Sequence, residues 1–451
     1  MRKLFGTDGV RGVANRELTS DLAFKLGQAA AYVLAGELEH KPRIMVGTDT
    51  RISCDMLECA LNAGLCSVGA DVISLGIIPT PGVAYLTSKY KADAGVVISA
   101  SHNSFEFNGI KFFDSKGYKL PDKLEIKIEE FVFSDVKLPH KTGVNIGRII
   151  KKNEYNRVYI KFLISQSEAD VSGMKILLDC ANGAAFRSAP IAFTKLGADI
   201  TVVNASPDGI NINDGCGSTH ISVLSDMVTE GDYDIGFAYD GDADRVIAVA
   251  EDGSLIDGDR MLAVLALDMK EKGVLADNTL VVTVMSNMGL DSLAKENGIS
   301  IVKSKVGDRY VIEEMRKNGY SLGGEQSGHV IILDCNTTGD GILTSIKIAG
   351  IIAGTEKTAS QIFGVMEEYP QVMVNAVVAD KNKFKILDDD TVKIMISGIE
   401  NEFNGDGRLL IRPSGTEPVV RVMMEGRDYE YIKVKAKEMA ELIEERFGEE
   451  V

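Results

Sequence analysis

The chain has 451 residues, which is enough for about three domains of ordinary size. Acidic residues outnumber basic residues by 66 to 49, and the resulting net charge of −17 argues against a general nucleic-acid-binding protein, which needs a basic face. Apolar residues make up 45% of the chain and charged residues 25%, as in ordinary globular proteins, and no apolar run reaches the roughly 18 residues of a membrane span.

The first residues, MRKLFGTDG, lack the apolar core of a secretion signal, so we expect a cytoplasmic protein that contacts neither nucleic acid nor membrane. Six cysteines are spread along the chain without the close pairs that a metal cluster requires. We expect them to be buried free thiols.

Three segments share one pattern, in which a short apolar strand is followed by a polar loop, an amphipathic helix and a second strand. They are residues 43–76, 175–203 and 279–303. This pattern is typical of a βαβ unit, which implies parallel strand pairing with a right-handed crossover. The three copies predict three related α/β domains with mixed, largely parallel sheets.

The C-terminal part of the sequence has a different pattern. The alternating runs QVMVNAVVA and PVVRVMMEG predict strands, and DYEYIKVKAKEMAELIEERF predicts a long helix, which together indicate a smaller α+β domain. Residues 133–152 show neither periodicity and predict a linker, and a hinge is expected near Tyr369-Pro370. The predicted domains are 1–151, 152–253, 254–368 and 369–451.

The motif ISASHN, residues 98–103, follows the strand-like run AGVVIS. Ser101 therefore stands where a chain leaves a buried strand, a position that presents a side chain at the edge of a cleft. Taken alone, a serine at such a place is more often a helix cap. His102 can polarise a nearby phosphate or hydroxyl group, or be an ordinary loop histidine. The GxSxG pattern of a hydrolase is absent around Ser101.

The run FAYDGDADRVIAVA, residues 237–250, predicts a polar turn between two apolar strands. Asp240, Asp242 and Asp244 repel one another at this spacing unless a cation lies among them. An EF-hand would need glycine at the sixth position, where the chain has Arg245, and helices rather than strands on both sides. The sequence therefore predicts Mg²⁺ with open coordination positions, in preference to calcium or a solvated acidic turn.

The motif GGEQSGH, residues 323–329, combines glycines with groups that bind sugar hydroxyls. Glu325, Ser327 and His329 supply acceptors and donors suited to vicinal hydroxyl groups, although glycine-rich turns are often only turns.

The motif RPSGTEP, residues 412–418, lies between two strand-like runs. Backbone N–H groups around Ser414, Gly415 and Thr416 can form an anion-binding nest, with Arg412 and Arg421 supplying positive charge. The spacing matches neither a P-loop nor GxGxxG, and an ordinary polar turn is the alternative.

Together, a phosphoryl carrier, a cation site, a hydroxyl-binding motif and a phosphate clamp indicate phosphosugar chemistry. Over essentially its whole length the chain resembles the α-D-phosphohexomutase superfamily, through FGTDGVRG, ISASHN, NGIKFF, DGDADR, VGDRYV, GGEQSGH and RPSGTEPVVRVM. Within it, these motifs are most similar to those of the bacterial enzymes that act on glucosamine phosphates. One departure is Ser104, where relatives commonly have proline.

The resemblance implies four domains around a central cleft and an activity that interconverts glucosamine 6-phosphate and glucosamine 1-phosphate through a phosphoserine and a sugar 1,6-bisphosphate. Such an enzyme supplies the synthesis of UDP-N-acetylglucosamine, and a homodimer is compatible with the resemblance.

The resemblance also implies roles for individual residues. Phosphorylated Ser101 would bind one Mg²⁺ per chain together with the three aspartates, Glu325 and Ser327 would bind sugar hydroxyls, and the RPSGT loop would hold the substrate phosphate. Basic positions that match those of the superfamily's active site are Arg11, Lys111, Arg245 and His329. Lys111 and His329 are both candidates for proton transfer.

Two alternatives stay open at this stage. The first is a phosphomannomutase or phosphoglucomutase of the same superfamily, because no motif can be argued to recognise a 2-amino group. The second is a non-catalytic phosphosugar-binding protein, which would keep the RPSGT clamp but need neither Ser101 nor three clustered aspartates.

Overall fold

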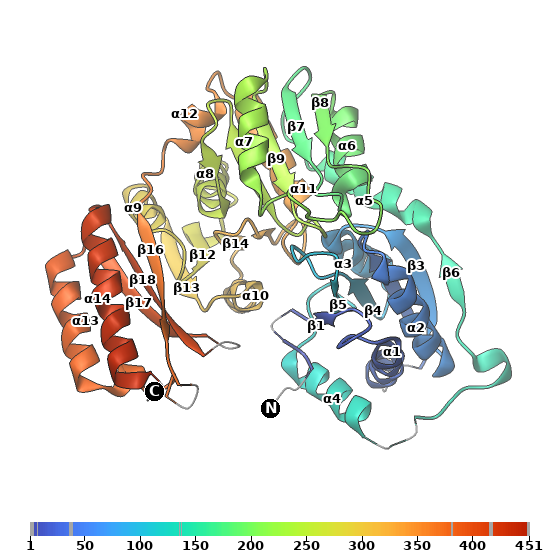
Figure 1. Cartoon of the computed structure of the whole chain (residues 1–451). Coiled ribbons are helices and arrows are strands. Elements are labelled where there is room, and N and C mark those ends of the chain that lie inside the picture. Colours follow the sequence, from blue (N-terminus) through green and yellow to red (C-terminus); the bar gives the residue numbers. More distant parts are fainter. Residues whose placement is uncertain are drawn as a thin grey trace. The chain divides into compact units, whose positions relative to one another are not determined.

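The chain folds into two compact units in the computed structural model, which describes residues 4–6, 8–35, 39–134, 136, 138–379, 382–414 and 418–448. The first unit comprises Met1–Ser286 and Glu296–Val365, and the second comprises Asn287–Lys295 and Met366–Val451. Figure 1 labels the helices and strands of both units. The first unit contains three sheets and the second contains one.

The first sheet has six strands in the order β1-β5-β4-β2-β3-β6. Its strands are β1 (Val10–Val13), β2 (Arg43–Thr48), β3 (Asp71–Ile77), β4 (Ala94–Ile98), β5 (Phe107–Asp114) and β6 (Ile149–Lys151). Strands β2, β3, β4 and β6 run parallel, whereas β5 pairs antiparallel with β4 and β1. The sheet is therefore mixed, and its buried strands read as continuous apolar runs.

Helices cover both faces of this sheet (Figure 1). Helices α1 (Ser20–Ala35), α2 (Ser53–Ser67) and α4 (Asp122–Phe133) pack their apolar stripes on one face, around Val46 and Val96. Helices α3 (Thr80–Lys89) and α5 (Asn156–Ser165) contribute to the core on the other face, around Met45 and Phe113.

The linker expected at residues 133–152 is only partly correct. Its last residues form β6, which pairs with β3 in parallel and extends the first sheet. The adjacent residues Ile149 and Ile150 are both substantially exposed. This short strand therefore lacks the alternation of buried apolar and exposed polar residues by which strands are recognised in a sequence. Backbone hydrogen bonds, and not apolar burial, hold this strand in the sheet.

The second and third sheets repeat the βαβ arrangement. The second has the order β11-β10-β9-β7-β8 and the third the order β13-β12-β14-β15. Their strands are β7 (Lys175–Asp179), β8 (Asp199–Val203), β9 (Ile235–Tyr239), β10 (Val246–Ala250), β11 (Leu255–Ile256), β12 (Thr279–Thr283), β13 (Ser300–Ser304), β14 (Leu322–Gly324) and β15 (Val330–Ile332). The strand pairs of all three predicted units, β2/β3, β7/β8 and β12/β13, are parallel, which confirms the repeat.

The remaining helices of the first unit connect or cover these sheets. They are α6 (Ala185–Leu196), α7 (Ile221–Glu230), α8 (Gly258–Glu271), α10 (Asp308–Asn318), α11 (Gly341–Ala353) and α12 (Ala359–Phe363). Short 3₁₀ turns occur at Gly143–Asn145, Asn153–Tyr155, Ala276–Asn278 and, in the second unit, Ile386–Asp388. Two features of this unit matter for the site: polar turns follow β4 and β9, and a hairpin joins β14 to β15.

The second unit is a small α+β domain, as the sequence predicts. Strands β16 (Gln371–Val377), β18 (Val419–Gly426) and β17 (Gly407–Pro413) form an antiparallel sheet, and helices α13 (Asp390–Phe403) and α14 (Tyr429–Phe447) pack on one face of it (Figure 1).

Helix α9 (Met288–Glu296) belongs to this second unit although it connects β12 to β13. The buried carboxylate of Glu425 accepts a hydrogen bond of 2.7 Å from the N–H of Met288, and the Asn287 side chain hydrogen-bonds both backbone polar groups of Tyr369. Tyr369 and Pro370 therefore lie inside the second unit, which the chain re-enters at Met366. The hinge expected near these two residues stays a prediction.

The cysteines form no disulfide, as expected, but the prediction that all six are buried is wrong. Cys54, Cys180 and Cys216 are buried, Cys66 and Cys335 are partly covered, and Cys59 is exposed. Cys59 stands on the outward face of α2, where spacing within an amphipathic helix decides exposure more strongly than residue type. None of the helices in the described ranges is long and apolar enough to cross a membrane.

Two glycines set the distance between α1 and α2. A Cβ at Gly64 would lie 2.1 Å from the carbonyl oxygen of Phe24, and a Cβ at Gly27 would lie 2.4 Å from that of Leu61. Both obstacles are backbone atoms, so a larger residue cannot be accommodated by a rotamer change. The two helices depend on these glycines to approach closely.

We expect Gly64→Ala to lower the free energy of unfolding of the first unit by about 1–3 kcal/mol, because α1 and α2 must move apart. Gly350→Ala is the matched control: Gly350 is also buried in a helix, α11, but its added Cβ would meet its nearest atom at 3.9 Å. That variant should gain up to about 1 kcal/mol from helix propensity. Calorimetry of both variants measures the change in the free energy of unfolding. Equal changes in Gly64→Ala and Gly350→Ala would contradict the argument that a Cβ at Gly64 forces α1 and α2 apart.

Candidate active site

Ser101 lies just beyond the end of β4, as expected from the sequence. Its side chain is almost fully buried, and its backbone is in the left-handed region with φ of +53°. The hydroxyl Oγ donates a hydrogen bond of 2.6 Å to Oδ2 of Asp240. A non-glycine residue in this conformation is strained, and such strain is found mainly where the surrounding structure holds a functional group in place.

The three aspartates occupy the turn between the antiparallel strands β9 and β10. Asp240, Asp242 and Asp244 are all buried, and one carboxylate oxygen of each lies within 4.8 Å of the others. Ala243, between the last two, has a left-handed backbone with φ of +55°. The tight turn therefore concentrates three carboxylates where water cannot screen their repulsion.

Lys111 on β5 provides the main balancing charge for these carboxylates. Its buried Nζ lies 2.8 Å from Asp242, 3.0 Å from Asp8 and 3.5 Å from Asp244. Burial acts to lower the pKa of Lys111, but the carboxylates outweigh it and raise the pKa well above its ordinary value. Lys111 is therefore a permanent positive charge in this site.

The aspartates differ in how well their charges are compensated. Burial and the neighbouring carboxylates of Asp244 and Asp242 raise the pKa of Asp240 well above its ordinary value. Burial acts in the same direction on Asp244, but Lys111 and His329 outweigh it and hold its pKa well below the usual range. Asp240, the partner of Ser101, is thus the carboxylate for which an additional cation would be most favourable.

The cluster fits a small hard cation. Oδ1 of Asp242 and Oδ1 of Asp244 are buried and accept no hydrogen bond from the described residues. Buried polar atoms without such a partner are costly, and a cation would satisfy both. The available ligands are carboxylate and hydroxyl oxygens, which are the donors that Mg²⁺ prefers.

His329, at the start of β15, has a defined orientation. The backbone N–H of Gly339 donates a hydrogen bond of 3.0 Å to Nε2, which assigns the proton of the neutral ring to Nδ1. Nδ1 faces Oδ1 of Asp244 at 3.8 Å, and Asp308 lies 3.5 Å from Nε2. Burial acts against the charged form, but the carboxylates of Asp244 and Asp308 outweigh it and raise the pKa of His329.

A cavity of about 400 Å³ opens beside these groups. Arg11, His102, Arg245, Glu325 and His329 all line it. Burial, together with the charges of the nearby arginines, lowers the pKa of His102 to about 4, so this ring is neutral near pH 7. The cavity thus presents permanent cations beside the serine and the acidic cluster.

Part of the predicted set lines the cavity: Arg11, Asp244, Arg245, Glu325 and His329 do, whereas Ser101, Lys111, Asp240 and Asp242 do not. Oε1 of Glu325 accepts a hydrogen bond of 3.0 Å from Gly307 N–H at the rim. Ser327, expected to bind sugar hydroxyls, lies at the exposed tip of the β14–β15 hairpin and is not among the residues that line the cavity.

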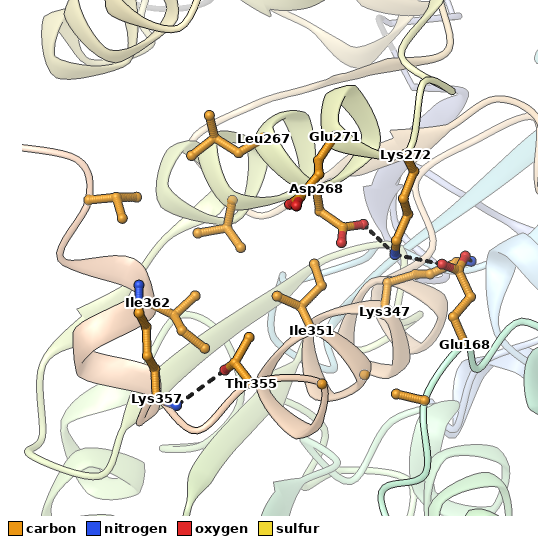
Figure 2. Close-up of a pocket in the computed structure, with 15 residues that line it drawn as sticks. Glu168, Leu267, Asp268, Glu271, Lys272, Lys347, Ile351, Thr355, Lys357 and Ile362 are labelled. Atoms are coloured by element: carbon orange, nitrogen blue, oxygen red, sulfur yellow. Dashed lines mark hydrogen bonds and ion pairs between the residues drawn. The ribbon is translucent and has the colours of Figure 1, made fainter.

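A larger cavity of about 660 Å³ lies elsewhere in the first unit, between α8 and α11 (Figure 2). Figure 2 shows Lys272 between Asp268 and Glu168, and both carboxylates accept hydrogen bonds from it. Lys347 also donates to Glu168. Four charged side chains of this cavity, Glu168, Asp268, Lys272 and Lys347, pair with one another, and the cavity contains none of the predicted site residues. Size alone therefore does not identify the active site.

The predicted phosphate clamp belongs to the second unit. Arg412 on β17 and Arg421 on β18 are directly opposite each other in the antiparallel register, and Ser414 is buried at the end of β17. Burial and the charge of Arg421 lower the pKa of Arg412. Gly415 and Thr416 lie outside the described residues.

Several residues of the site have no predicted role in the sequence analysis. Asp8 and Asp308 lie in the motifs FGTDGVRG and VGDRYV, and both accept hydrogen bonds from Lys119. Thr80, at the start of α3, donates a hydrogen bond of 2.5 Å to Oδ2 of Asp242. Asp8 and Asp308 could have been predicted from the two motifs that contain them. Nothing in the sequence distinguishes Thr80 or Lys119 from residues outside the site.

Family models match all four parts of the chain. They are described as phosphoglucomutase/phosphomannomutase alpha/beta/alpha domain I for residues 2–138, domain II for 157–253, domain III for 257–369, and the C-terminal domain for 373–442. The chain belongs to the phosphoglucomutase/phosphomannomutase family. The phosphohexomutase resemblance indicated by the motifs is thereby confirmed.

Relatives within this mutase family match over the full length. A protein named phosphoglucosamine mutase from Ruminiclostridium cellulolyticum is 58% identical over 449 residues, covering 99% of this chain and 100% of the relative. One of the same name from Clostridioides difficile is 56% identical over 451 residues, covering 99% of this chain and 100% of the relative.

Two solved structures show the same fold. A phosphoglucomutase/phosphomannomutase family protein from Burkholderia thailandensis has a TM-score of 0.82 at 23% identity, covering 97% of both chains. Aspergillus fumigatus N-acetylphosphoglucosamine mutase, in complex with GlcNAc-6P and magnesium, has a TM-score of 0.71 at 17% identity, covering 98% of this chain and 96% of that one.

If the acidic cluster binds a divalent cation, Mg²⁺ should stabilise the protein. At about 100 times its dissociation constant, the free energy of unfolding should rise by about 2.7 kcal/mol. Asp242→Asn should lose most of this gain, because it removes one ligand charge. Asp268→Asn, a change to a paired carboxylate in the larger cavity, should keep it. Thermal unfolding with and without Mg²⁺ measures the stabilisation of each variant. Equal stabilisation of Asp242→Asn and Asp268→Asn would contradict a cation site at the three aspartates.

Proposed function

We propose that this chain interconverts glucosamine 6-phosphate and glucosamine 1-phosphate, with phosphorylated Ser101 as the phosphoryl donor and a sugar 1,6-bisphosphate as the intermediate. The full-length relatives named phosphoglucosamine mutase support this reaction. The observation that carries the proposal is the hydrogen bond from Ser101 Oγ to Asp240, within a cluster of buried carboxylates and beside a cavity lined by cations. A protein that merely bound phosphosugars would need no such pair.

We propose Mg²⁺ as the cation of the acidic cluster, with Asp240, Asp242, Asp244 and an oxygen on Ser101 as its ligands. A relative of the same fold is described in complex with magnesium, which supports this choice. When bound there, the ion would supply positive charge to the oxygens of the phosphoryl group on Ser101.

Lys111 would act on the same phosphoryl group as a second positive charge. Three carboxylates surround its ammonium, so it keeps its proton and offers a fixed charge instead of acting as a base. Phosphoryl transfer depends mainly on alignment and on neutralising oxygen charge. Arg11 and Arg245, which line the cavity, would supply further positive charge to a bound phosphate.

His329 is the better of the two candidates for proton transfer. Lys111 keeps its proton, whereas His329 is an imidazole that the Gly339 N–H holds in one orientation at the cavity wall. Glu325 lies in the same wall and offers a carboxylate that accepts hydrogen bonds from sugar hydroxyls. The substrate would thus lie between Ser101 and these two side chains.

We propose that Arg412 and Arg421 bind the phosphate that is not being transferred. Like charges directly opposite each other on neighbouring strands repel, and a bound phosphate dianion would relieve that repulsion. The RPSGT loop would add backbone N–H donors. During the reaction the intermediate must reorient, so that each of its phosphates in turn occupies this position.

The cytoplasm is the compartment we propose for this reaction. All six cysteines are free thiols, and a reducing compartment keeps thiols in that state.

A direct test of the function compares the 6-phosphates of glucosamine, glucose and mannose as substrates for one preparation. We expect the highest kcat/KM for glucosamine 6-phosphate. Ser101→Ala should lose at least about 10³-fold in kcat, because no group remains to carry the phosphoryl group. Intact-mass measurement should find a phosphate on the unaltered chain and none on this variant. Full activity of Ser101→Ala would refute the phosphoserine, and a preference for glucose or mannose would refute the substrate.

Arg412→Gln should raise KM for the sugar phosphate by about tenfold or more, because it removes a charge-assisted contact to phosphate. Phosphorylation of Ser101 should be unchanged in this variant. Lys393→Gln, a change to an exposed cation on α13 of the same domain, is the control and should leave KM as it was. Steady-state kinetics measures these effects. An unchanged KM in Arg412→Gln would show that Arg412 does not bind the substrate phosphate.

A further inference from the structure

Both backbone polar groups of Ser101 are held by buried side chains that lie behind the serine. The Ser101 N–H donates a hydrogen bond of 3.0 Å to Oγ of Ser99. The Ser99 hydroxyl in turn donates one of 2.6 Å to Oδ2 of Asp49. Asp49 follows β2 and Ser99 follows β4, and these are parallel neighbours, so both residues lie at the same edge of the first sheet.

The carbonyl of Ser101 is held by an arginine that is bound to the same aspartate. Nη2 of Arg51 donates a hydrogen bond of 2.9 Å to Ser101 O, and Nε donates one of 2.9 Å to Oδ2 of Asp49. The hydrogen bonds therefore form a closed ring, which runs from the Ser101 N–H through Ser99, Asp49 and Arg51 back to the Ser101 carbonyl. The side chains of Asp49 and Arg51 are fully buried.

The turn that follows Ser101 is held by the same arginine and by one further residue. Arg51 also donates to the carbonyls of Asn103, at 2.8 Å, and Ser104. Nδ2 of Asn213, from the loop after β8, donates at 2.9 Å to the carbonyls of both Ser101 and Asn103. The turn is thus fixed from two of the three sheets of the first unit.

These contacts compensate a conformation that costs energy. A left-handed backbone at a residue with a side chain is strained, and it persists only when surrounding contacts determine it. None of Asp49, Arg51, Ser99 and Asn213 lines the 400 Å³ cavity. Their contacts leave rotation about the side-chain bond of Ser101 as its main remaining freedom.

We propose that Asp49, Arg51, Ser99 and Asn213 are positioning residues for phosphoryl transfer, which act only by fixing the backbone of Ser101. The inference rests on the proposed function, since it assumes that Ser101 carries the phosphoryl group. Because the transferred group must stay in line with its acceptor, a displacement of about 1 Å costs about 10²-fold in rate. Loss of the ring of hydrogen bonds behind Ser101 should therefore lower kcat and leave KM nearly unchanged.

Ser99→Thr and Ser99→Val form a matched pair for this test. Both add the same bulk at a fully buried position, but only threonine keeps the hydroxyl that joins the Ser101 N–H to Asp49. The rate of a single turnover from phosphorylated enzyme to glucosamine 6-phosphate should be about 10- to 100-fold lower for Ser99→Val than for Ser99→Thr, with KM within about twofold. Equal rates for the pair would overturn the proposal.

Arg51→Lys tests the part of the hydrogen-bonded ring that holds the Ser101 carbonyl. It also provides a test of the proposal if substitutions at Ser99 prevent folding. Lysine retains the charge next to Asp49 but cannot place donors on all the carbonyls that arginine reaches. We expect kcat to fall by about 10-fold or more at unchanged KM. Thr50→Val is the control, because it removes a buried hydrogen bond of 2.6 Å to the carbonyl of Asn182 and leaves the Ser101 turn intact.

The outcomes separate this inference from the proposed function. If Thr50→Val loses as much activity as Arg51→Lys, or if Arg51→Lys has wild-type kcat, the positioning role is refuted. If Ser101→Ala remains active, the proposed function itself fails. If Ser101→Ala is inactive while Ser99→Val and Arg51→Lys keep the wild-type kcat, only the positioning role is lost.

Discussion

Mutual repulsion of three buried carboxylates is the constraint on which this structure depends. Asp240, Asp242 and Asp244 lie within a few ångströms of one another where water does not screen them. Buried charges are tolerated only when they are paired, so the fold must deliver compensating groups to this point. The first sheet carries Lys111, and His329 lies beside the third sheet. The charge of Asp240 is less well compensated, and a bound cation would balance it.

The same constraint explains why the functional groups come from the ends of different strands. A turn of few residues can concentrate negative charge and supply Arg245, but it cannot also provide the nucleophile and the other compensating cations. Ser101 follows β4, the aspartates follow β9, and His329 directly precedes β15. Each sheet buries its own strands, so each of these ends is held rigidly. Rigid supports allow a reacting oxygen to be aligned, which is the main requirement of phosphoryl transfer.

Much of this arrangement can be predicted from the sequence, because some features are encoded locally. The βαβ pattern predicted three parallel strand pairs, the alternating runs after residue 370 predicted the C-terminal sheet, and the spacing of the aspartates predicted a cation site. Each of these signals depends on residues close together in the chain.

Other features depend on tertiary contacts that leave no local signal. The role of Thr80 arises from its contact with Asp242, and β6 is held by backbone hydrogen bonds alone. Ser327 is exposed in the turn of the β14–β15 hairpin, and its contact with sugar hydroxyls stays a prediction. The ring behind Ser101 joins residues whose types are ordinary, and only the parallel pairing of β2 and β4 brings them together.

Anomalous diffraction from crystals grown with Mn²⁺ in place of Mg²⁺ tests the central claim most directly, provided that Mn²⁺ also supports turnover. The account predicts one strong peak, within coordination distance of a carboxylate oxygen of each of Asp240, Asp242 and Asp244 and of an oxygen on Ser101. An enzyme that is active with Mn²⁺ but shows no peak there, or shows its peak beside Glu168 and Asp268, would contradict the account.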